Sequence, residues 1–163
     1  MTSLVNSLDT DKLSFYRTKH HFEKYGEFHT VDEFIQYCRW AEDQEVCLYV
    51  LGNGSNVLFK SRKISSLVLK NKLNQDIDAL GGGRFEISSS TQVIDVLRYC
   101  YAQSLESFYY LSSVPATIGG ALAMNAGRGR QQNMTVYDFV ESVTFFDVEQ
   151  NQIKTLQPTE IVK

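Results

Sequence analysis

Two stretches of the chain decide what it can fold into and bind: Val50–Leu58, VLGNGSNVL, and Val114–Gly127, VPATIGGALAMNAG. Each places glycine and small polar residues directly after an apolar run. Glycine accepts positive φ angles and lets a ligand approach the main chain, and successive exposed N–H groups form a concave anion site. Both stretches are therefore candidate phosphate-binding loops, and the second would use free N–H groups at the start of a short helix.

The spacing of the glycines excludes the two best-known phosphate loops. A dinucleotide-binding G-x-G-x-x-G would need a third glycine at position 57, which is Val57, and no G-K-[ST] follows either glycine cluster. The plain alternative for Gly52–Asn56 is a hairpin turn between two strands, and the plain alternative for Gly119-Gly120 is helix packing. The two loops together are more informative than either alone.

The sequence around the loops alternates between helical and extended patterns. Thr30 and Glu33 form a capping box that opens a first helix, and a second helix is predicted to begin near Thr91. Apolar runs predict strands at 46–51, 66–70, 84–88 and 140–147, with 152–156 paired to the last. This order predicts an α+β fold with mixed strands rather than a regular βαβ ladder. The polar residues 1–12 are expected to be a loose N-terminus.

Composition limits the classes of function that the chain can have. Its 163 residues provide one ordinary domain or two small lobes. The formal net charge of −3 gives no support for nucleic-acid binding through bulk charge. No signal peptide and no apolar stretch of the ~18 residues needed to span a bilayer is present, so no membrane association is predicted. The three cysteines lack C-x-x-C spacing and predict reduced thiols in a cytoplasmic protein, with no metal site.

The paired loops, about 60 residues apart, resemble the FAD-binding domain of the UDP-N-acetylenolpyruvoylglucosamine reductase (UDP-N-acetylmuramate dehydrogenase) family. That family belongs to the vanillyl-alcohol oxidase / p-cresol methylhydroxylase (PCMH) flavoproteins. Its pattern, L-G-x-G-S-N-x-L and then I-P-G-T-x-G-G-A-x-x-x-N-A-G, is matched within a resemblance that runs from about Ser14 to Glu160. The resemblance implies an α+β, two-lobed PCMH-type FAD-binding domain with mixed sheets over 13–156, with lobes at about 13–69 and 77–156.

The resemblance also implies which residues bind FAD. The first loop would hold the pyrophosphate, and the second loop and its continuation would line the flavin and its phosphates. These residues are Gly52, Asn53, Gly54, Ser55, Asn56, Pro115, Thr117, Gly119, Gly120, Ala121, Asn125, Ala126 and Gly127. Covalent members of the superfamily carry a His in or near the first loop, and 52–59 contains none, so the FAD is expected to be non-covalent. A Gly54→Val substitution is expected to weaken flavin binding and to leave the fold largely intact.

Several positions depart from the family pattern. Ser113 and Ala116 replace glycines, and a positive φ at Ala116 would be strained. Tyr109 stands where the family usually has Glu, and the tyrosine of N-A-G-A-Y-G is missing after Gly127. Residues 157–163 would begin a missing C-terminal region, and the family's Y-R-x-S segment, which leads into its proton donor and substrate arginine, has no counterpart here. No catalytic residue is therefore assigned.

The function implied by the resemblance is the FAD-binding part of an NADPH-dependent oxidoreductase. That enzyme reduces an enolpyruvyl UDP-sugar in peptidoglycan precursor synthesis in the cytoplasm, and this chain alone is expected to be inactive. The substituted loops favour an alternative, a non-catalytic FAD- or nucleotide-binding homologue. A further alternative is a different flavin oxidoreductase of the same superfamily. FAD is the expected partner, with NADPH and a UDP-sugar if the full catalytic chain exists.

Overall fold

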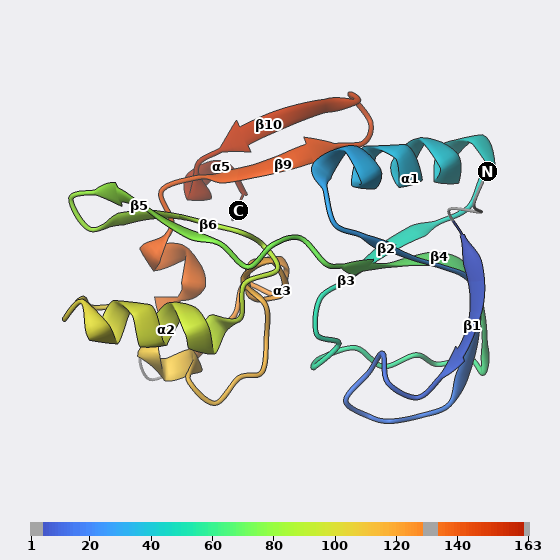
Figure 1. The fold of residues 1–163 in the computed structure, drawn as a ribbon, viewed down its shortest axis with the longest axis horizontal. Helices are drawn as coiled ribbons and strands as arrows, with labels where there is room; N and C mark the ends of the chain where they lie inside the picture. Colours follow the sequence, from blue (N-terminus) through green and yellow to red (C-terminus); the bar gives the residue numbers. More distant parts are fainter. Residues whose placement is uncertain (1–4, 129–133, 162–163) are drawn as a thin grey trace.

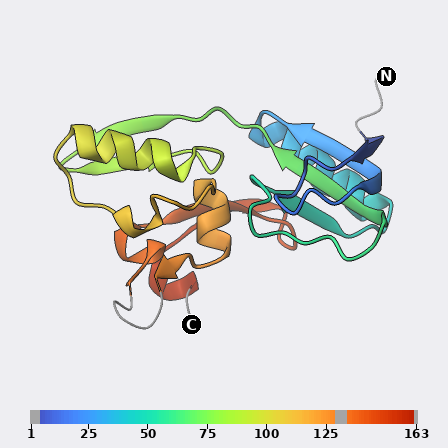
Figure 2. The same ribbon diagram turned by 90° about the horizontal axis from the view of Figure 1, so that it is seen from below.

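The protein is described by a computed structural model covering residues 5–128 and 134–161. Two groups of elements lie side by side and are joined by the chain that leaves β4 (Lys63–Asn71), as Figures 1 and 2 show from two directions. The N-terminal group holds a four-stranded sheet and one helix, and the second group holds short helices and two-stranded hairpins. The loops singled out above belong one to each group.

The N-terminal sheet has the strand order β1-β2-β4-β3, with β1 at Asn6–Thr10, β2 at His20–Phe28 and β3 at Leu48–Leu51. β4 runs parallel to both of its neighbours, and Val68 lies opposite Tyr25 on one side and Tyr49 on the other. β1 is antiparallel to β2. The carboxyl ends of three parallel strands therefore meet at one edge of the sheet.

The N-terminus departs from the expectation of loose chain over residues 1–12. Residues 6–10 form β1, in which Thr10 lies opposite His20. Leu8 packs against the buried cluster that contains Phe22. A five-residue polar strand with one apolar anchor has too little periodicity to be recognised in the sequence, and the free edge of β2 supplies its hydrogen bonds. Residues 1–4 lie outside the described part.

Helix α1, at Val31–Asp43, confirms the predicted helix and its cap. The Thr30 side chain accepts a hydrogen bond from the Glu33 N–H at 3.1 Å. Tyr37 and Ala41 of α1 pack on the sheet against Leu67 and Leu69 of β4. The intervening Val68 points to the opposite face of the sheet, into a cluster with Leu13, Phe22 and Leu51. β4 is thus buried on both faces, which explains its continuous apolar run.

The second group has its own core around α2 (Val93–Ala102). Buried residues of α2 pack with Phe108, Ile118, Ala121 and Val136. The remaining elements are β5 (Ile77–Gly81), β6 (Arg84–Ile87), η1 (Tyr109–Leu111), α3 (Ile118–Ala123), β7 (Gly127–Arg128), β8 (Met134–Thr135), η2 (Val136–Phe139), β9 (Val143–Asp147), β10 (Gln152–Leu156) and α5 (Pro158–Ile161).

The strand directions confirm the predicted fold class, since parallel and antiparallel pairs occur together and helices pack beside the sheets. The β9–β10 hairpin reaches back to the N-terminal group, where Phe146 meets Phe34 of α1 edge to face at 6.2 Å between ring centroids. Figure 1 shows the β9–β10 hairpin passing beside α1. The two groups therefore share an apolar boundary.

Replacing Leu67 by alanine tests the importance of the doubly covered strand. Leu67 is 0% exposed, so its loss creates a cavity that β4 cannot close, and the free energy of unfolding should fall by about 2–5 kcal/mol. Leu58→Ala removes the same atoms from a side chain that is 59% exposed and should change stability by less than about 0.5 kcal/mol. Urea denaturation followed by circular dichroism measures both, and equal effects would contradict this account of the core.

Candidate functional site

The first glycine loop starts at the carboxyl edge of the parallel strands. β3 ends at Leu51 and runs parallel to β4, so residues 52–62 form a crossover between parallel neighbours. The hairpin alternative for Gly52–Asn56 is wrong, because a hairpin requires antiparallel strands. In sheets of parallel strands, ligands bind beyond the carboxyl ends of the strands. The loop therefore occupies the position that such folds use for binding.

The backbone of this loop presents free hydrogen-bond donors. Within the described chain, none of the N–H groups of residues 53–56 donates to a protein acceptor. Backbone N–H groups inside folded proteins are normally paired, so a consecutive run without protein partners is available to water or to a ligand. A concave run of such donors binds anions.

Gly54 fixes the shape of the loop on the side that faces residues 13–15, the chain before β2. It has φ +70, and a Cβ there would lie 2.0 Å from the Leu13 carbonyl oxygen. The Phe15 N–H donates to the Gly54 carbonyl at 3.2 Å, and the Ser14 hydroxyl donates to the Val57 carbonyl at 2.5 Å. The expectation that Gly54→Val leaves the fold largely intact is therefore wrong, because the new side chain would push residues 13–15 away from the loop.

On its other side, the loop contacts the second motif, which lies about 60 residues later in the chain, at Pro115 and Thr117. The Asn53 side-chain amide donates to the Pro115 carbonyl at 3.1 Å and to Gln92 Oε1 at 2.5 Å. Gly52 approaches Thr117 so closely that a Cβ at position 52 would lie 2.6 Å from Thr117 Oγ1. The structure thus brings the first loop together with the start of the second, as the family resemblance implied.

The second loop differs from the expectation in one respect. The first N–H groups of α3 are already used: Ile118 donates to the Thr91 carbonyl at 2.9 Å, Gly119 to the Ser89 carbonyl at 2.8 Å, and Gly120 to Thr117 Oγ1 at 3.2 Å. The prediction of free N–H groups at this helix start is therefore wrong. The loop before α2 satisfies the first two and the Thr117 side chain satisfies the third, which sequence spacing could not reveal.

Glycine at 119 has a packing reason in this structure. A Cβ at Gly119 would lie 3.0 Å from the Ser89 carbonyl oxygen, which is tighter than ordinary contacts. Ala121, which follows, is 1% exposed and belongs to the core of the second group. The second loop is thus a packed wall beside the first loop rather than a second cradle of donors.

The residues Asn125-Ala126-Gly127 end α3. Asn125 has φ +43, its N–H donates to the Leu122 carbonyl, and the Ala126 N–H donates to the Ala121 carbonyl at 2.9 Å. These two hydrogen bonds form a Schellman motif, in which asparagine often takes the left-handed position. The stretch lies at the end of α3 opposite Thr117, and its hydrogen bonds connect it to α3, β8 and η2 rather than to residues 52–56.

Ala116, at a glycine position of the family pattern, carries no backbone strain. It is absent from the described residues with positive φ, and its carbonyl accepts a hydrogen bond from Val93 N–H at 2.9 Å. The strain that a positive φ would cause at Ala116 does not arise, because the backbone there has ordinary geometry. The loop's path does not depend on glycine at this position.

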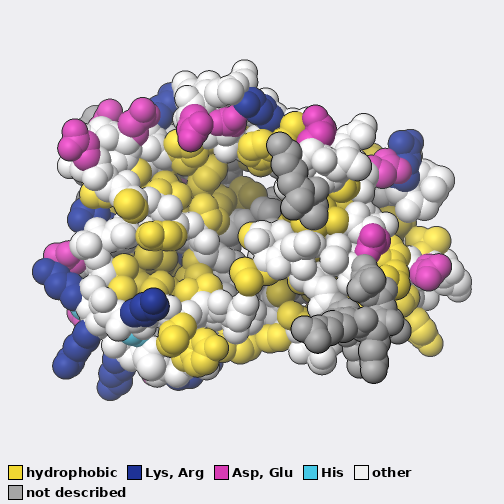
Figure 3. All heavy atoms as spheres, turned by 180° about the vertical axis from the view of Figure 1, so that it is seen from behind, with side chains coloured by type: hydrophobic (Ala, Val, Ile, Leu, Met, Phe, Trp, Pro, Cys, Tyr) yellow, Lys and Arg dark blue, Asp and Glu magenta, His cyan; other side chains and the backbone are white. Residues whose placement is uncertain are grey.

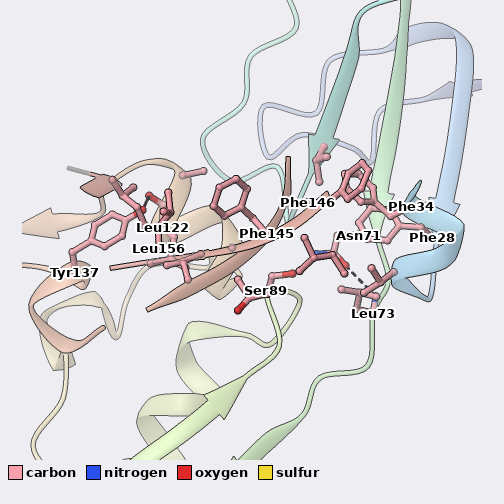
Figure 4. Close-up of a pocket in the computed structure, with 18 residues that line it drawn as sticks. Phe28, Phe34, Asn71, Leu73, Ser89, Leu122, Tyr137, Phe145, Phe146 and Leu156 are labelled. Carbon is pink, nitrogen blue, oxygen red and sulfur yellow. Dashed lines mark hydrogen bonds between the residues drawn. The ribbon is translucent and has the colours of Figure 1, made fainter. Parts of the chain in front are cut away.

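An apolar cavity of about 580 Å³ lies between the two groups and opens beside the second loop. Figure 4 shows phenylalanines of the N-terminal group and of β9 around it, with the polar side chains of Asn71 and Ser89 between them. Asn71 donates to Ser89 Oγ at 2.9 Å, which joins the end of β4 to the segment before α2. Gly119 is the predicted site residue that lines this cavity. Seen from behind, apolar side chains gather on the N-terminal half and toward the middle of the molecule (Figure 3).

Three residues at the site were missed by sequence reasoning: Lys70, Ser89 and Gln92. The Lys70 ammonium donates a hydrogen bond to the Gly52 carbonyl, and Gln92 holds the Asn53 amide. Burial, with a smaller effect of Lys72, lowers the pKa of Lys70. The cation that follows the buried run Leu67-Val68-Leu69 was a signal that could have been noticed, whereas Ser89 and Gln92 are brought to the loops by tertiary packing alone.

The described residues contain no group of three or more His, Cys, Asp or Glu side chains placed to hold one metal ion. Cys38 and Cys100 are buried free thiols, and Cys47 is an exposed one. None of the helices in the described ranges has both the length and the apolar character that a bilayer crossing requires.

Comparison with known proteins gives a consistent result. An FAD-binding domain family model matches residues 25–156. The UDP-N-acetylenolpyruvoylglucosamine reductase of Aquifex aeolicus is 34% identical over 68% of this chain and 36% of its own length. The enzyme of that name from a Synechococcus strain is 28% identical over 91% of this chain and 46% of its own length. The chain therefore spans less than half the length of these relatives.

Solved structures agree with the fold. The UDP-N-acetylenolpyruvylglucosamine reductase of Thermus caldophilus superposes with a TM-score of 0.75 over 96% of this chain and 53% of that one, at 22% identity. A solvent-stable cholesterol oxidase superposes with a TM-score of 0.59 over 96% of this chain and 34% of the other, at 14% identity. The predicted resemblance is confirmed: the chain is a distant homologue of these reductases over most of its length, and it belongs to the FAD-binding domain family.

Proposed function

We propose that this chain binds FAD non-covalently and forms the flavin-binding part of an oxidoreductase of the reductase type described above. The observation that carries the proposal is the run of free N–H groups at residues 53–56, at the carboxyl edge of parallel strands. These donors suit the pyrophosphate, because backbone N–H groups bind phosphate oxygens without requiring a cationic side chain.

The surroundings of the loop fit the rest of the FAD molecule. FAD carries a ring system on each side of its pyrophosphate, and the apolar cavity of about 580 Å³ has Gly119 of the second loop in its wall. Ligand pockets commonly have about 300–1,000 Å³ and mostly apolar walls. Gly52, Asn53, Gly54, Ser55 and Asn56 would face the phosphates, and Pro115, Thr117, Gly119, Gly120 and Ala121 would support them, with Asn125, Ala126 and Gly127 continuing the wall.

Non-covalent binding is supported by the histidines. The segment 52–59 contains none, and His20 has both ring nitrogens engaged, by Thr18 Oγ1 at 2.6 Å and by the Ser61 carbonyl at 2.7 Å. His20 is also buried. An imidazole held in this way is not free to attack a flavin ring.

When bound, FAD accepts and delivers hydride, and this chain's residues bind and orient it. The names of the relatives support an enolpyruvyl UDP-sugar as the acceptor. The family resemblance implies NADPH as the electron donor and a place in cytoplasmic cell-wall precursor synthesis. The chain spans under half of those relatives, and no residue within it is proposed as the proton donor.

One observation favours a second candidate function, a non-catalytic FAD- or nucleotide-binding homologue. The N–H groups at the start of α3 are occupied by Ser89, Thr91 and Thr117, so the second loop offers fewer polar contacts to a ligand than the family resemblance implies. The two functions differ in whether the bound flavin exchanges electrons.

Titration of the purified chain with FAD tests the proposed function. Flavin fluorescence and absorbance should change to saturation at one FAD per chain, because the N–H groups of the first loop take the pyrophosphate. Denaturation followed by filtration should release all of the yellow colour, since residues 52–59, where covalent members of the superfamily carry their histidine, contain none. Absence of saturable binding would refute the FAD proposal, and colour retained on the denatured chain would refute its non-covalent part.

A charge placed at Ser55 tests the location of the phosphates. Ser55→Asp brings a carboxylate beside the loop and should weaken FAD binding by about tenfold or more, because like charges at short range repel. Ser55→Asn is the matched control, because asparagine has nearly the size of aspartate without its charge. Its affinity for FAD should stay close to that of the wild-type chain. The effect of the aspartate should diminish at high salt. Equal affinities for the two variants would place the pyrophosphate elsewhere.

The FAD-loaded chain should not reduce enolpyruvyl-UDP-N-acetylglucosamine. General acid catalysis needs a proton donor within hydrogen-bond reach of the reacting carbon, and the Y-R-x-S segment that precedes the family's donor is absent from the sequence. Anaerobic mixing with NADPH should bleach the flavin slowly, and adding the sugar should not restore its absorbance rapidly. Rapid reoxidation by the sugar would show that the chain contains a donor. A flavin that NADPH never bleaches would favour the non-catalytic homologue.

A further inference from the structure

Lys70, beside the first loop, is a cation whose nearest carboxylate neighbour, Glu27 on the adjacent strand β2, acts on it from beyond ion-pair distance. In the described ranges 5–128 and 134–161, none of the ion pairs within 4.0 Å includes it. Its side chain is half-buried, and the one acceptor assigned to its ammonium is the Gly52 carbonyl. A half-buried ammonium normally finds an anion or several acceptors, so this placement requires an explanation.

The sheet register places Lys70 directly behind the first loop. Lys70 lies opposite Leu51, the last residue of β3, so its side chain stands next to the point where β3 gives way to the loop. Val68, two residues earlier on the same face, packs against Leu51 in the buried cluster. Because Val68 and Leu51 are packed in the buried cluster beside it, the Lys70 ammonium extends toward the peptide that links Gly52 to Asn53.

The Gly52–Asn53 peptide links the Lys70 hydrogen bond to the first of the free N–H donors, that of Asn53. All described peptide bonds are trans, and in a trans peptide the C=O and the N–H point in opposite directions. Because the Gly52 carbonyl points to Lys70, the Asn53 N–H points away from it, and no protein acceptor takes that N–H. A hydrogen bond from an ammonium to the carbonyl also polarises the peptide and makes its N–H a better donor.

We propose that Lys70 is a positioning residue of the anion site: its ammonium holds the Gly52 carbonyl and so turns the Asn53 N–H outward, toward the pyrophosphate of the ligand. The inference rests on the proposed FAD-binding function and adds a residue outside both glycine motifs. Lys70 acts through the Gly52–Asn53 peptide and not as a direct phosphate ligand. Asn53 is fixed independently on its side-chain end by Gln92 and Pro115.

Three variants separate the hydrogen bond from the charge. Lys70→Met removes both, Lys70→Gln keeps a donor without the charge, and Lys72→Met removes an equal charge from an exposed neighbour two residues away. We expect Lys70→Met to weaken the binding of FAD and of ADP, which share the pyrophosphate, by about tenfold, the size of one charge-assisted hydrogen bond. Lys70→Gln should recover most of the loss, and Lys72→Met should bind like wild type.

An NMR measurement on the ligand-free protein complements the affinity measurements. The amide ¹⁵N resonance of Asn53 senses hydrogen bonding to the preceding carbonyl, so it should move in Lys70→Met and stay in place in Lys72→Met. Wild-type affinity in Lys70→Met, an unmoved Asn53 resonance, or a Lys70→Gln variant as weak as Lys70→Met would overturn the positioning role. ADP binding that depends on Lys70 without any FAD binding would refute the proposed function and keep the inference, and a wild-type chain that binds neither would refute both.

Discussion

Two glycines of the first loop lie against other parts of the chain at distances that leave no room for a β-carbon, and the candidate site depends on this close approach. On the outer side, Gly54 touches the Leu13 carbonyl, with a positive φ that other residues resist. On the inner side, Gly52 touches Thr117. The loop is thus held between the chain before β2 and the start of α3. Close contacts on both sides thus restrain a backbone that contains little regular structure, and a preorganised backbone is what an array of N–H donors needs.

The polar side chains around the first loop form hydrogen bonds that fix its position, and the backbone N–H groups of residues 53–56 remain free to bind a ligand. The Asn53 amide faces Gln92 and Pro115, and Lys70 holds the Gly52 carbonyl. Ser14 holds the loop's far end through the Val57 carbonyl. Each contact removes a carbonyl or a side chain from competition for the N–H groups of residues 53–56. The division suits a site that recognises phosphate through the backbone and whose side chains fix geometry.

The fold class could be predicted because its signals are local. The cap at Thr30 and the doubly buried run of β4 were visible in the sequence, and the order of helices and strands excluded a regular βαβ ladder. The two glycine loops were also recognisable, and their meeting followed from the family pattern. β1 was missed because its pairing depends on the edge of β2 and not on its own residues.

The chemistry of the two loops could not be predicted equally well. Spacing alone suggested two similar phosphate cradles, and the structure shows one run of free donors and one packed wall. The difference arises in the segment before α2, whose carbonyls at Ser89 and Thr91 reach the start of α3. Such contacts depend on how two groups of elements pack, and no local pattern records them. The place of Lys70 beside the first loop could not be predicted for the same reason, since it comes from lying opposite Leu51 in the parallel strand pair β3–β4.

The unequal roles of the loops bear on how the chain tolerates its departures from the family pattern. If both loops supplied donors from strained backbone, alanine at 116 would harm the site. Ala116 instead has ordinary geometry and serves as an acceptor for Val93 at the start of α2, while the left-handed turn of this region falls at Asn125, where asparagine accepts it. Ala116 therefore lies in the loop whose N–H groups already have protein partners and whose path is held by packing. The first loop, whose backbone conformation matters most, keeps the family's G-x-G-S-N without change.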